Sequence, residues 1–129
     1  MTSGWSRRTV LGLIATASTL ALPGIARAKG GRVVVVGGGF GGSAVARTIK
    51  RLAPGIDVTL IARNTSFVCC PGSNTVVGGF GRIEDQTVGY EALAKDGVTI
   101  ITGRADAVDT NARTLRLADG SVLPYDKLE

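Results

Sequence analysis

The fold of this chain is decided by residues 32–42, which read RVVVVGGGFGG. A continuous run of valines is typical of a strand that is buried on both faces of a parallel sheet. The glycines that follow fit the pattern Gly-x-Gly-x-x-Gly at Gly37, Gly39 and Gly42, and apolar residues at helical spacing run from about residue 41 to residue 52. A strand, a glycine-rich turn and a helix in this order predict the first unit of an α/β fold.

Each glycine of this turn has a physical reason to be there. Gly37 permits a tight turn, Gly39 lets backbone amides approach a pyrophosphate, and Gly42 allows close packing of helix on strand. Phe40 and Gly41 lie at the helix start, where unpaired N–H groups and about half a positive charge favour phosphates. A turn without a ligand is the alternative, but it does not need five glycines in six positions. The turn therefore predicts a dinucleotide cofactor.

The chain continues with the same alternation of strands and helices. A second strand is expected over Asp57–Ile61, beyond the helix stop at Pro54-Gly55, and a third buried strand over Val98–Ile101. A long loop separates these two strands and leads into a short helical pattern from Gly89 to Lys95. Right-handed crossovers place such strands side by side in one parallel sheet.

The C-terminal third predicts a small antiparallel β-meander. Three short segments of alternating apolar residues cover 105–109, 114–117 and 122–123. Asp119-Gly120 between the last two is a hairpin signal. Residues 125–129 resemble the beginning of another strand, and there the chain stops. The expected fold class is α/β: residues 29–129 form a partial FAD/NAD(P)-binding domain with a Rossmann-like parallel sheet and a meander, truncated before the domain is complete.

The composition of the 129 residues narrows the chemistry. The chain has no histidine, which removes the usual general base, the Ser-His and Cys-His nucleophile pairs and most mixed zinc sites. Two adjacent cysteines, Cys69 and Cys70, do not make a four-thiolate metal site. The acids Asp106 and Glu84 show no pairing with another acid. We therefore expect neither a metal site nor a catalytic residue in this chain.

The basic excess belongs mainly to the N-terminus. Lysine and arginine total 15 against 10 acidic residues, but Arg7, Arg8 and Arg27 lie in the first 28 residues, which contain no acid. The remaining chain has 12 basic and 10 acidic residues. Because no basic stripe with interleaved aromatic residues remains, a nucleic-acid partner is not expected.

Residues 1–28 have the three parts of an export signal peptide. The pair Arg7-Arg8 precedes an apolar run from Val10 to Leu22 and resembles a twin-arginine signal. The small residues Ala26 and Ala28 suit a signal peptidase, which would make Lys29 the mature N-terminus. The run is shorter than the ~20 residues of a membrane-spanning helix, so no stable membrane span is expected. We expect export to the periplasm by the twin-arginine route. An ordinary Sec signal and an uncleaved anchor are the alternatives.

The second strand ends without the acid that usually holds the adenosine ribose. Ala62 occupies that position, about 20 residues beyond the last glycine, and Arg63 follows it. A hydrogen bond to a charged group is worth ~1.5–3 kcal/mol, so its loss would weaken reversible dinucleotide binding. Arg63 also suits the 2′-phosphate of NADP(H), and the glycines alone leave FAD and NADP(H) open. Ala105, at the start of the meander, completes the candidate cofactor-binding residues.

Residues 64–79, which read NTSFVCCPGSNTVVGG, resemble the loop after the second strand in the flavoprotein subunit of flavocytochrome c sulfide dehydrogenases. The resemblance covers essentially residues 30–128, with supporting matches in the glycine-rich turn, in VTLI at 58–61, GYEAL at 89–93 and LADG at 117–120. Cys-Pro-x-Ser-Asn at this spacing is more family-specific than the glycine turn. The meander also resembles the antiparallel crossover within the FAD domain of two-dinucleotide-binding flavoproteins, which favours FAD.

The resemblance implies that FAD is attached covalently, by a thioether from Cys70 to the 8α-methyl group of the flavin. It also implies a redox-active cysteine pair in later segments that these 129 residues do not contain. The chain departs from the family pattern at Ala62, at Gly72, where a bulky apolar residue is common, and at Cys69, which is an extra thiol. Two unreactive loop thiols, or a vicinal disulfide, are the alternatives to the thioether.

The function implied by the resemblance is that of a flavoprotein oxidoreductase. We expect the N-terminal FAD-binding fragment of a periplasmic protein that oxidises sulfide, a small inorganic sulfur substrate, and passes electrons to a c-type cytochrome subunit. The alternatives are a sulfide:quinone or NAD(P)H-dependent reductase of the same superfamily and a non-catalytic, truncated dinucleotide-binding remnant.

Overall fold

The computed structural model describes residues 30–129, so the predicted export signal over residues 1–28 and the expected mature N-terminus at Lys29 lie outside the described part. In chain order the elements are β1 (Arg32–Val36), α2 (Phe40–Leu52), β2 (Asp57–Ala62), β3 (Ser66–Val68), α3 (Ser73–Val77), the 3-10 helix η1 (Glu84–Gln86), β4 (Thr87–Gly89), α4 (Glu91–Lys95), β5 (Thr99–Thr102), β6 (Ala105–Asp109), β7 (Thr114–Leu117), β8 (Val122–Pro124) and β9 (Lys127–Leu128).

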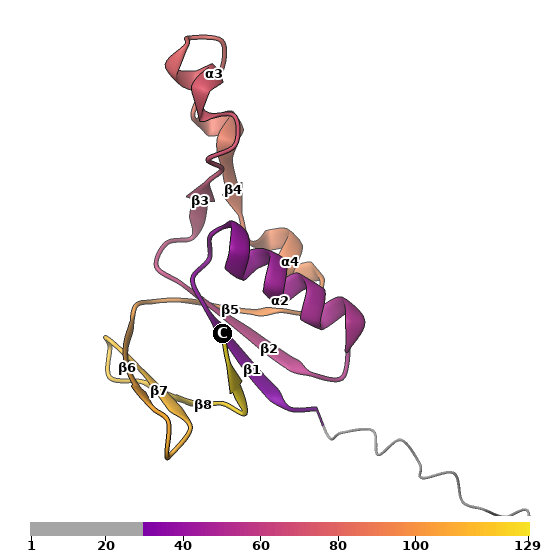
Figure 1. The fold of residues 1–129 in the computed structure, drawn as a ribbon, viewed down its shortest axis with the longest axis vertical. Helices are drawn as coiled ribbons and strands as arrows, with labels where there is room; N and C mark the ends of the chain where they lie inside the picture. Colours follow the sequence, from indigo (N-terminus) through magenta and orange to yellow (C-terminus); the bar gives the residue numbers. More distant parts are fainter. Residues whose placement is uncertain (1–29) are drawn as a thin grey trace, which may run out of the picture.

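Four parallel strands form the central sheet in the order β5-β2-β1-β9 (Figure 1). β1 pairs with β2 along its whole length, from Arg32 opposite Asp57 to Val36 opposite Ile61. The short strand β9 lies on the other side of β1, with Lys127 opposite Val33. The α/β fold with a parallel sheet is confirmed, including a strand at the end of the chain. The helix begins at Phe40, one residue earlier than expected.

Apolar side chains cover both faces of this sheet, because neighbouring residues of a strand point to opposite sides. On one face, Val33, Val35 and Leu60 pack with residues of α2 and α4. On the other face, Val34 and Ile61 pack against the meander. Burying a leucine or valine side chain contributes about 1.5–3 kcal/mol each. The expectation that β1 is buried on both faces is confirmed.

Strands β6, β7 and β8 form the predicted antiparallel meander. Leu115 and Leu117 of β7 are buried against the sheet. The β7–β8 hairpin turns at Gly120, whose φ of +88° suits a residue without a side chain. The Asp119 carboxylate accepts hydrogen bonds from the hydroxyl of Ser121 (2.6 Å) and its backbone N–H (2.9 Å), and these bonds hold the pKa of Asp119 below its usual value.

Residues 66–89 form an arm that projects from the sheet (Figure 1). Its base is a two-stranded antiparallel ribbon of β3 and β4, with Ser66 opposite Gly89 and Val68 opposite Thr87. The expectation of a plain loop here is wrong, because three-residue strands without buried side chains give no alternating pattern. Since Gly89 belongs to β4, the following helix α4 begins at Glu91 and not at Gly89.

Candidate cofactor site

The glycine-rich turn joins the carboxyl end of β1 to the start of α2. Gly37 has a φ of +114°, a value that side chains rarely allow, and its N–H donates to the carbonyl oxygen of Ile61 at 2.8 Å. α2 begins after Gly39 without a side-chain cap and has no acidic residue in its first turn. The first N–H groups of α2 are therefore available to a negatively charged ligand.

The glycines of this turn fall into two classes by the space around them. A Cβ atom on Gly42 would run into the carbonyl oxygen of Gly37 and lie 3.4 Å from Cγ1 of Val35, so the start of α2 is packed tightly on β1. A Cβ atom on Gly39 or Gly41 would meet nothing within 4 Å. The turn is thus tightly packed at Gly42 and at Gly38, where a Cβ atom would overlap the Tyr90 hydroxyl, and it borders open space at Gly37, Gly39 and Gly41.

Three of the residues singled out in the sequence line one cavity at the carboxyl ends of β1, β2 and β5. Gly37, Arg63 and Ala105 line this cavity of about 160 Å³, together with Arg104. Ligands of open α/β sheets bind outside the carboxyl ends of the strands, and two arginines favour an anionic group there. Arg104, whose guanidinium lies 3.8 Å from the Asp106 carboxylate, was not selected from the sequence. Its signal was a second basic residue, two positions after the end of β5.

Ala62 is placed differently from Arg63. Its side chain has 0% exposure and belongs to the apolar cluster between the sheet and α2, and its carbonyl oxygen accepts the N–H of Gly103 at 2.8 Å. Ala62 therefore offers no side-chain atom to a ligand in this structure. The neighbouring Arg63 is exposed and lines the cavity, because successive residues of a strand face opposite sides.

An aromatic cluster connects the glycine turn to the arm. Tyr90 is buried and its hydroxyl donates to the carbonyl oxygen of Gly38 at 2.9 Å. Phe67 of the arm stacks on Tyr90 with ring centroids 6.0 Å apart, and Phe40 meets Phe67 edge to face at 5.9 Å. Burial raises the pKa of Tyr90, so its hydroxyl stays protonated and continues to donate. Sequence reasoning gave Tyr90 and Phe67 no role.

The two cysteines follow β3 on the arm and have different surroundings. Cys69 is half-buried and lines a cavity of about 420 Å³ between α2, α4 and the arm, whereas Cys70 is exposed. The N–H of Cys69 donates to the carbonyl oxygen of Gln86 at 2.7 Å, and the N–H of Ser73 donates to that of Cys70 at 3.0 Å. Both thiols are free. The arm thus presents one of two adjacent thiols to solvent.

The family model for pyridine nucleotide-disulphide oxidoreductases matches residues 31–128, which are most of the chain. The chain belongs to this family. A sulfide dehydrogenase (flavocytochrome c) flavoprotein chain from Chlorobaculum thiosulfatiphilum is 58% identical over 45 residues, covering 35% of this chain and 94% of that sequence. The resemblance inferred from residues 64–79 and the glycine turn is confirmed.

Other members of the pyridine nucleotide-disulphide oxidoreductase family are much longer than this chain. A sulfide-quinone reductase from Aquifex aeolicus is 33% identical over 97 residues, which are 74% of this chain but 23% of that protein. The solved structure of the sulfide:quinone oxidoreductase from Aquifex aeolicus superposes with a TM-score of 0.71 at 32% identity, covering 76% of this chain and 23% of that one. The chain spans about a quarter of the length of these relatives.

Within this family fold, residues 30–129 contain no cluster of three or more residues suited to hold a metal ion. Over the same residues, none of the helices has both the length and the apolar character to cross a membrane. The candidate site consists of the glycine turn, the cavity beside it and the arm that carries Cys69 and Cys70.

Proposed function

We propose that this chain is the N-terminal FAD-binding part of a periplasmic flavoprotein that oxidises sulfide and passes the electrons to a c-type cytochrome subunit. The observation that carries the proposal is the 58% identity to a relative that is named as the flavoprotein chain of a flavocytochrome c sulfide dehydrogenase. The name of that relative indicates a flavin cofactor, a sulfide substrate and a cytochrome partner. Since the chain spans about a quarter of its longer relatives, the activity is proposed for the whole protein that contains it.

The described residues fit a dinucleotide such as FAD. The open space beside Gly39 and Gly41 leaves room for a pyrophosphate, and the uncapped start of α2 supplies N–H donors for it. Arg63 and Arg104 line the cavity next to the turn and add positive charge for the phosphates. When bound, FAD would accept an electron pair from the substrate and pass the electrons one at a time to an acceptor.

We assign the covalent attachment of the flavin to Cys70, whose side chain is exposed on the arm. The Cys70 sulfur would be joined to the 8α carbon of the flavin. Forming this bond would release the thiol proton, one 8α proton and two electrons, and dioxygen or a ferric cytochrome would accept the electrons. A tethered cofactor does not dissociate. The tether therefore compensates for the ribose contact that Ala62 does not provide.

The N-terminal sequence and the family support the proposed location and partner. The pair Arg7-Arg8 before an apolar run supports export by the twin-arginine route to the periplasm, where a c-type cytochrome subunit would meet the flavoprotein. Replacing both arginines by lysine should abolish export, and the mature exported protein should begin at Lys29. Export that continues after the double replacement would assign the signal to the Sec route.

A second candidate function is a sulfide:quinone reductase. It is favoured by the 33% identity over 97 residues to a sulfide-quinone reductase and by the TM-score of 0.71 to a sulfide:quinone oxidoreductase. The two candidates differ in the electron acceptor. The purified full-length protein, given sulfide, should reduce a ferric c-type cytochrome faster than a soluble quinone analogue if the first function is correct, and the reverse order would establish the second.

The covalent assignment is tested by denaturing the full-length protein in acid or urea and following the yellow colour. Colour should remain with the polypeptide in the unmodified protein and in the matched control Cys69→Ser, and it should be lost in Cys70→Ser. Loss of colour only in Cys69→Ser would move the attachment by one residue. Release of free FAD from the unmodified protein would refute the covalent link.

A further inference from the structure

Gln86 holds the arm on both sides of Cys70. It is the last residue of η1, and its backbone carbonyl oxygen accepts the N–H of Cys69 at 2.7 Å. Its side-chain amide donates to the carbonyl oxygen of Gly72 at 2.9 Å. Only Cys70 and Pro71 lie between these two anchor points, so one residue determines the path of the segment that carries the exposed thiol.

The hydrogen bond between Gln86 and Gly72 requires a glycine at position 72. Gly72 has a φ of +96°, and a Cβ atom there would lie 2.9 Å from Nε2 of Gln86, so a side chain at this position would displace the amide. The hydroxyl of Thr75 donates to the same carbonyl oxygen at 2.6 Å. The absence of a side chain at Gly72 thus leaves the space that the Gln86 amide requires.

The Gln86 side chain is kept in place although one of its own atoms is unsatisfied. Oε1 of Gln86 is buried and has no hydrogen-bond partner among residues 30–129. A buried amide oxygen without a partner costs free energy, and an apolar side chain of similar length would avoid that cost. The hydrogen bond from Nε2 to the carbonyl oxygen of Gly72 therefore explains why a polar side chain stands at this position.

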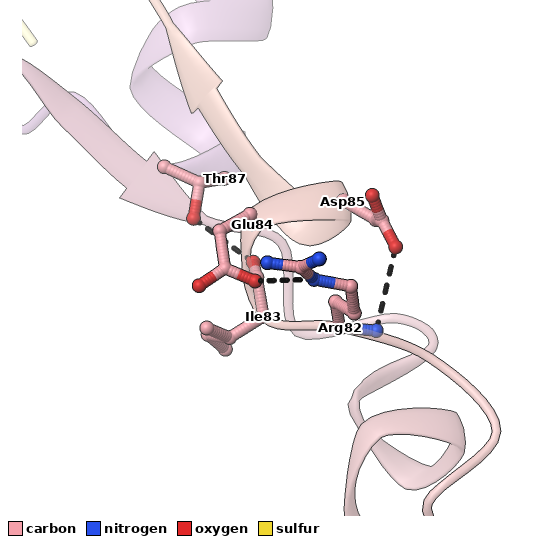
Figure 2. A network of polar contacts seen from close by, with 5 residues as sticks. All are labelled: Arg82, Ile83, Glu84, Asp85 and Thr87. Carbon is pink, nitrogen blue, oxygen red and sulfur yellow. Dashed lines mark hydrogen bonds and ion pairs between the residues drawn. The ribbon is translucent and has the colours of Figure 1, made fainter.

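The turn before β4 has its own polar contacts, which do not involve the Gln86 side chain (Figure 2). Arg82 pairs with the Glu84 carboxylate at 3.2 Å, and its backbone N–H donates to Asp85 at 3.4 Å. The hydroxyl of Thr87 donates to the carbonyl oxygen of Ile83 at 3.0 Å. These contacts flank Gln86 on both sides in the sequence without including its side chain, which makes them a suitable control.

We propose that Gln86 is a positioning residue that selects Cys70 over Cys69 for flavin attachment; this rests on the function proposed above. Its backbone carbonyl keeps Cys69 in line with the β3–β4 ribbon, where the Cys69 side chain lines the cavity beside α2. Its amide closes the other end of the segment and leaves the Cys70 side chain exposed. Without the amide, the segment is no longer tied to η1 at Gly72, and we expect the Cys70 thiol to sample more orientations.

The test adds FAD to the full-length apoprotein and measures how fast flavin becomes resistant to denaturation, with peptide mapping to locate it. Gln86→Met keeps the length of the side chain and removes the donor. We expect attachment to slow by about ten-fold or more, which corresponds to the loss of one hydrogen bond of ~1.4 kcal/mol, or to spread to Cys69. The control Glu84→Gln, which breaks the pair with Arg82 in the same turn, should attach flavin at Cys70 at the original rate.

A second variant separates positioning from general loosening of the arm. In Gln86→Glu, only the protonated acid donates to the Gly72 carbonyl oxygen, so the attachment rate relative to the unmodified protein at the same pH should rise as the pH falls from 7 towards ~4.3. A ratio that does not change with pH, or Gln86→Met with an unchanged rate and only Cys70 modified, would overturn the role of Gln86 while the covalent link stands. Absence of covalent flavin from the unmodified protein would instead refute the covalent attachment proposed above, on which the role of Gln86 rests.

Discussion

The sheet around the glycine turn and the arm that carries the cysteines are held together by different forces. In the sheet, Val34, Leu60 and Ile61 have exposures of 3%, 0% and 2%, so burial of apolar side chains fixes the position of the turn. In the arm, none of residues 66–89 is buried, and Val77 and Phe80 are 89% and 90% exposed. The arm depends on its backbone ladder and on a few polar side chains.

The difference in packing suits the sheet and the arm to different roles. The turn that would hold the cofactor phosphates is built on a tightly packed base, which keeps the N–H groups of α2 in place before a ligand arrives. The arm is joined to that base by the aromatic contacts of Phe67 with Tyr90 and Phe40. Substitutions at the base should therefore change the stability of the whole domain, whereas substitutions at the tip of the arm should change only local geometry.

The largest expected effect is that of Gly42→Ala. The new Cβ atom would overlap the carbonyl oxygen of Gly37, which is main chain and has no rotamer to adopt, so α2 must move away from β1. We expect a loss of about 3 kcal/mol in the free energy of unfolding, at the upper end of overpacking effects. Urea unfolding of the protein, followed by circular dichroism, measures this change.

Gly41→Ala is the matched control one residue away. Nothing lies within 4 Å of its added Cβ atom, and Gly41 is part of α2, where alanine is favoured over glycine by about 0.5–1 kcal/mol. The free energy of unfolding should therefore stay the same or rise. Equal destabilisation by both variants would contradict the division of the turn into packed and open glycines.

The sheet was predictable because its signals are local and strong. Four consecutive valines of β1 and the glycines after them define a strand, a turn and a helix within 21 residues, 32–52, and burial on both faces follows from the absence of polar residues in that run. The arm was not predictable in the same way. Strands of three residues such as Ser66–Val68 and Thr87–Gly89 have no period to detect, and their pairing joins residues about 20 positions apart.

The sequence indicated where the main chain of the candidate site lies, but not all of the side chains that support it. The glycines, Arg63 and Ala105 were selected from the sequence, and the structure brings Gly37, Arg63 and Ala105 around one cavity. Tyr90 was missed because its role depends on a hydrogen bond to Gly38, a residue 52 positions away. Gln86 was missed for the same reason, since its partner Gly72 lies 14 positions before it.

An intermediate effect is expected for Tyr90→Phe, which addresses the contact between the two regions. The variant keeps the ring that stacks on Phe67 and removes only the hydroxyl that donates to the Gly38 carbonyl oxygen. We expect a loss of about 0.5–1.5 kcal/mol in the free energy of unfolding. Ser43 also donates to this oxygen, at 3.0 Å, so Ser43→Ala serves as the partner variant.

The double variant decides whether the Gly38 carbonyl oxygen is the relevant acceptor. Each single variant leaves that oxygen with one donor, whereas the double variant leaves it with neither side chain. The combined loss in the free energy of unfolding should exceed the sum of the two single losses, because an unsatisfied carbonyl costs more than a weakened one. Strict additivity in a double-mutant cycle would contradict the shared role of Tyr90 and Ser43.

The smallest effect is expected for Asp126→Asn, far from the arm. The Asp126 carboxylate accepts the backbone N–H of Arg32 at 2.7 Å, and this bond, with the Arg32 side chain, holds the pKa of Asp126 below its usual value. A depressed pKa stabilises the folded state above the unfolded pKa of about 3.9, and that contribution is lost as the pH falls through the folded value. The unmodified protein should therefore be slightly more stable than Asp126→Asn at pH 7, and the gap should close as the pH falls through the lowered pKa of Asp126 in the folded state. A gap that persists at low pH would show that the lost contact is not charge-dependent.

Because Asp126 touches the start of β1 and not the turn or the arm, the rate of flavin attachment should be the same in Asp126→Asn and in the unmodified protein. This comparison separates a change in stability from a change in the presentation of Cys70.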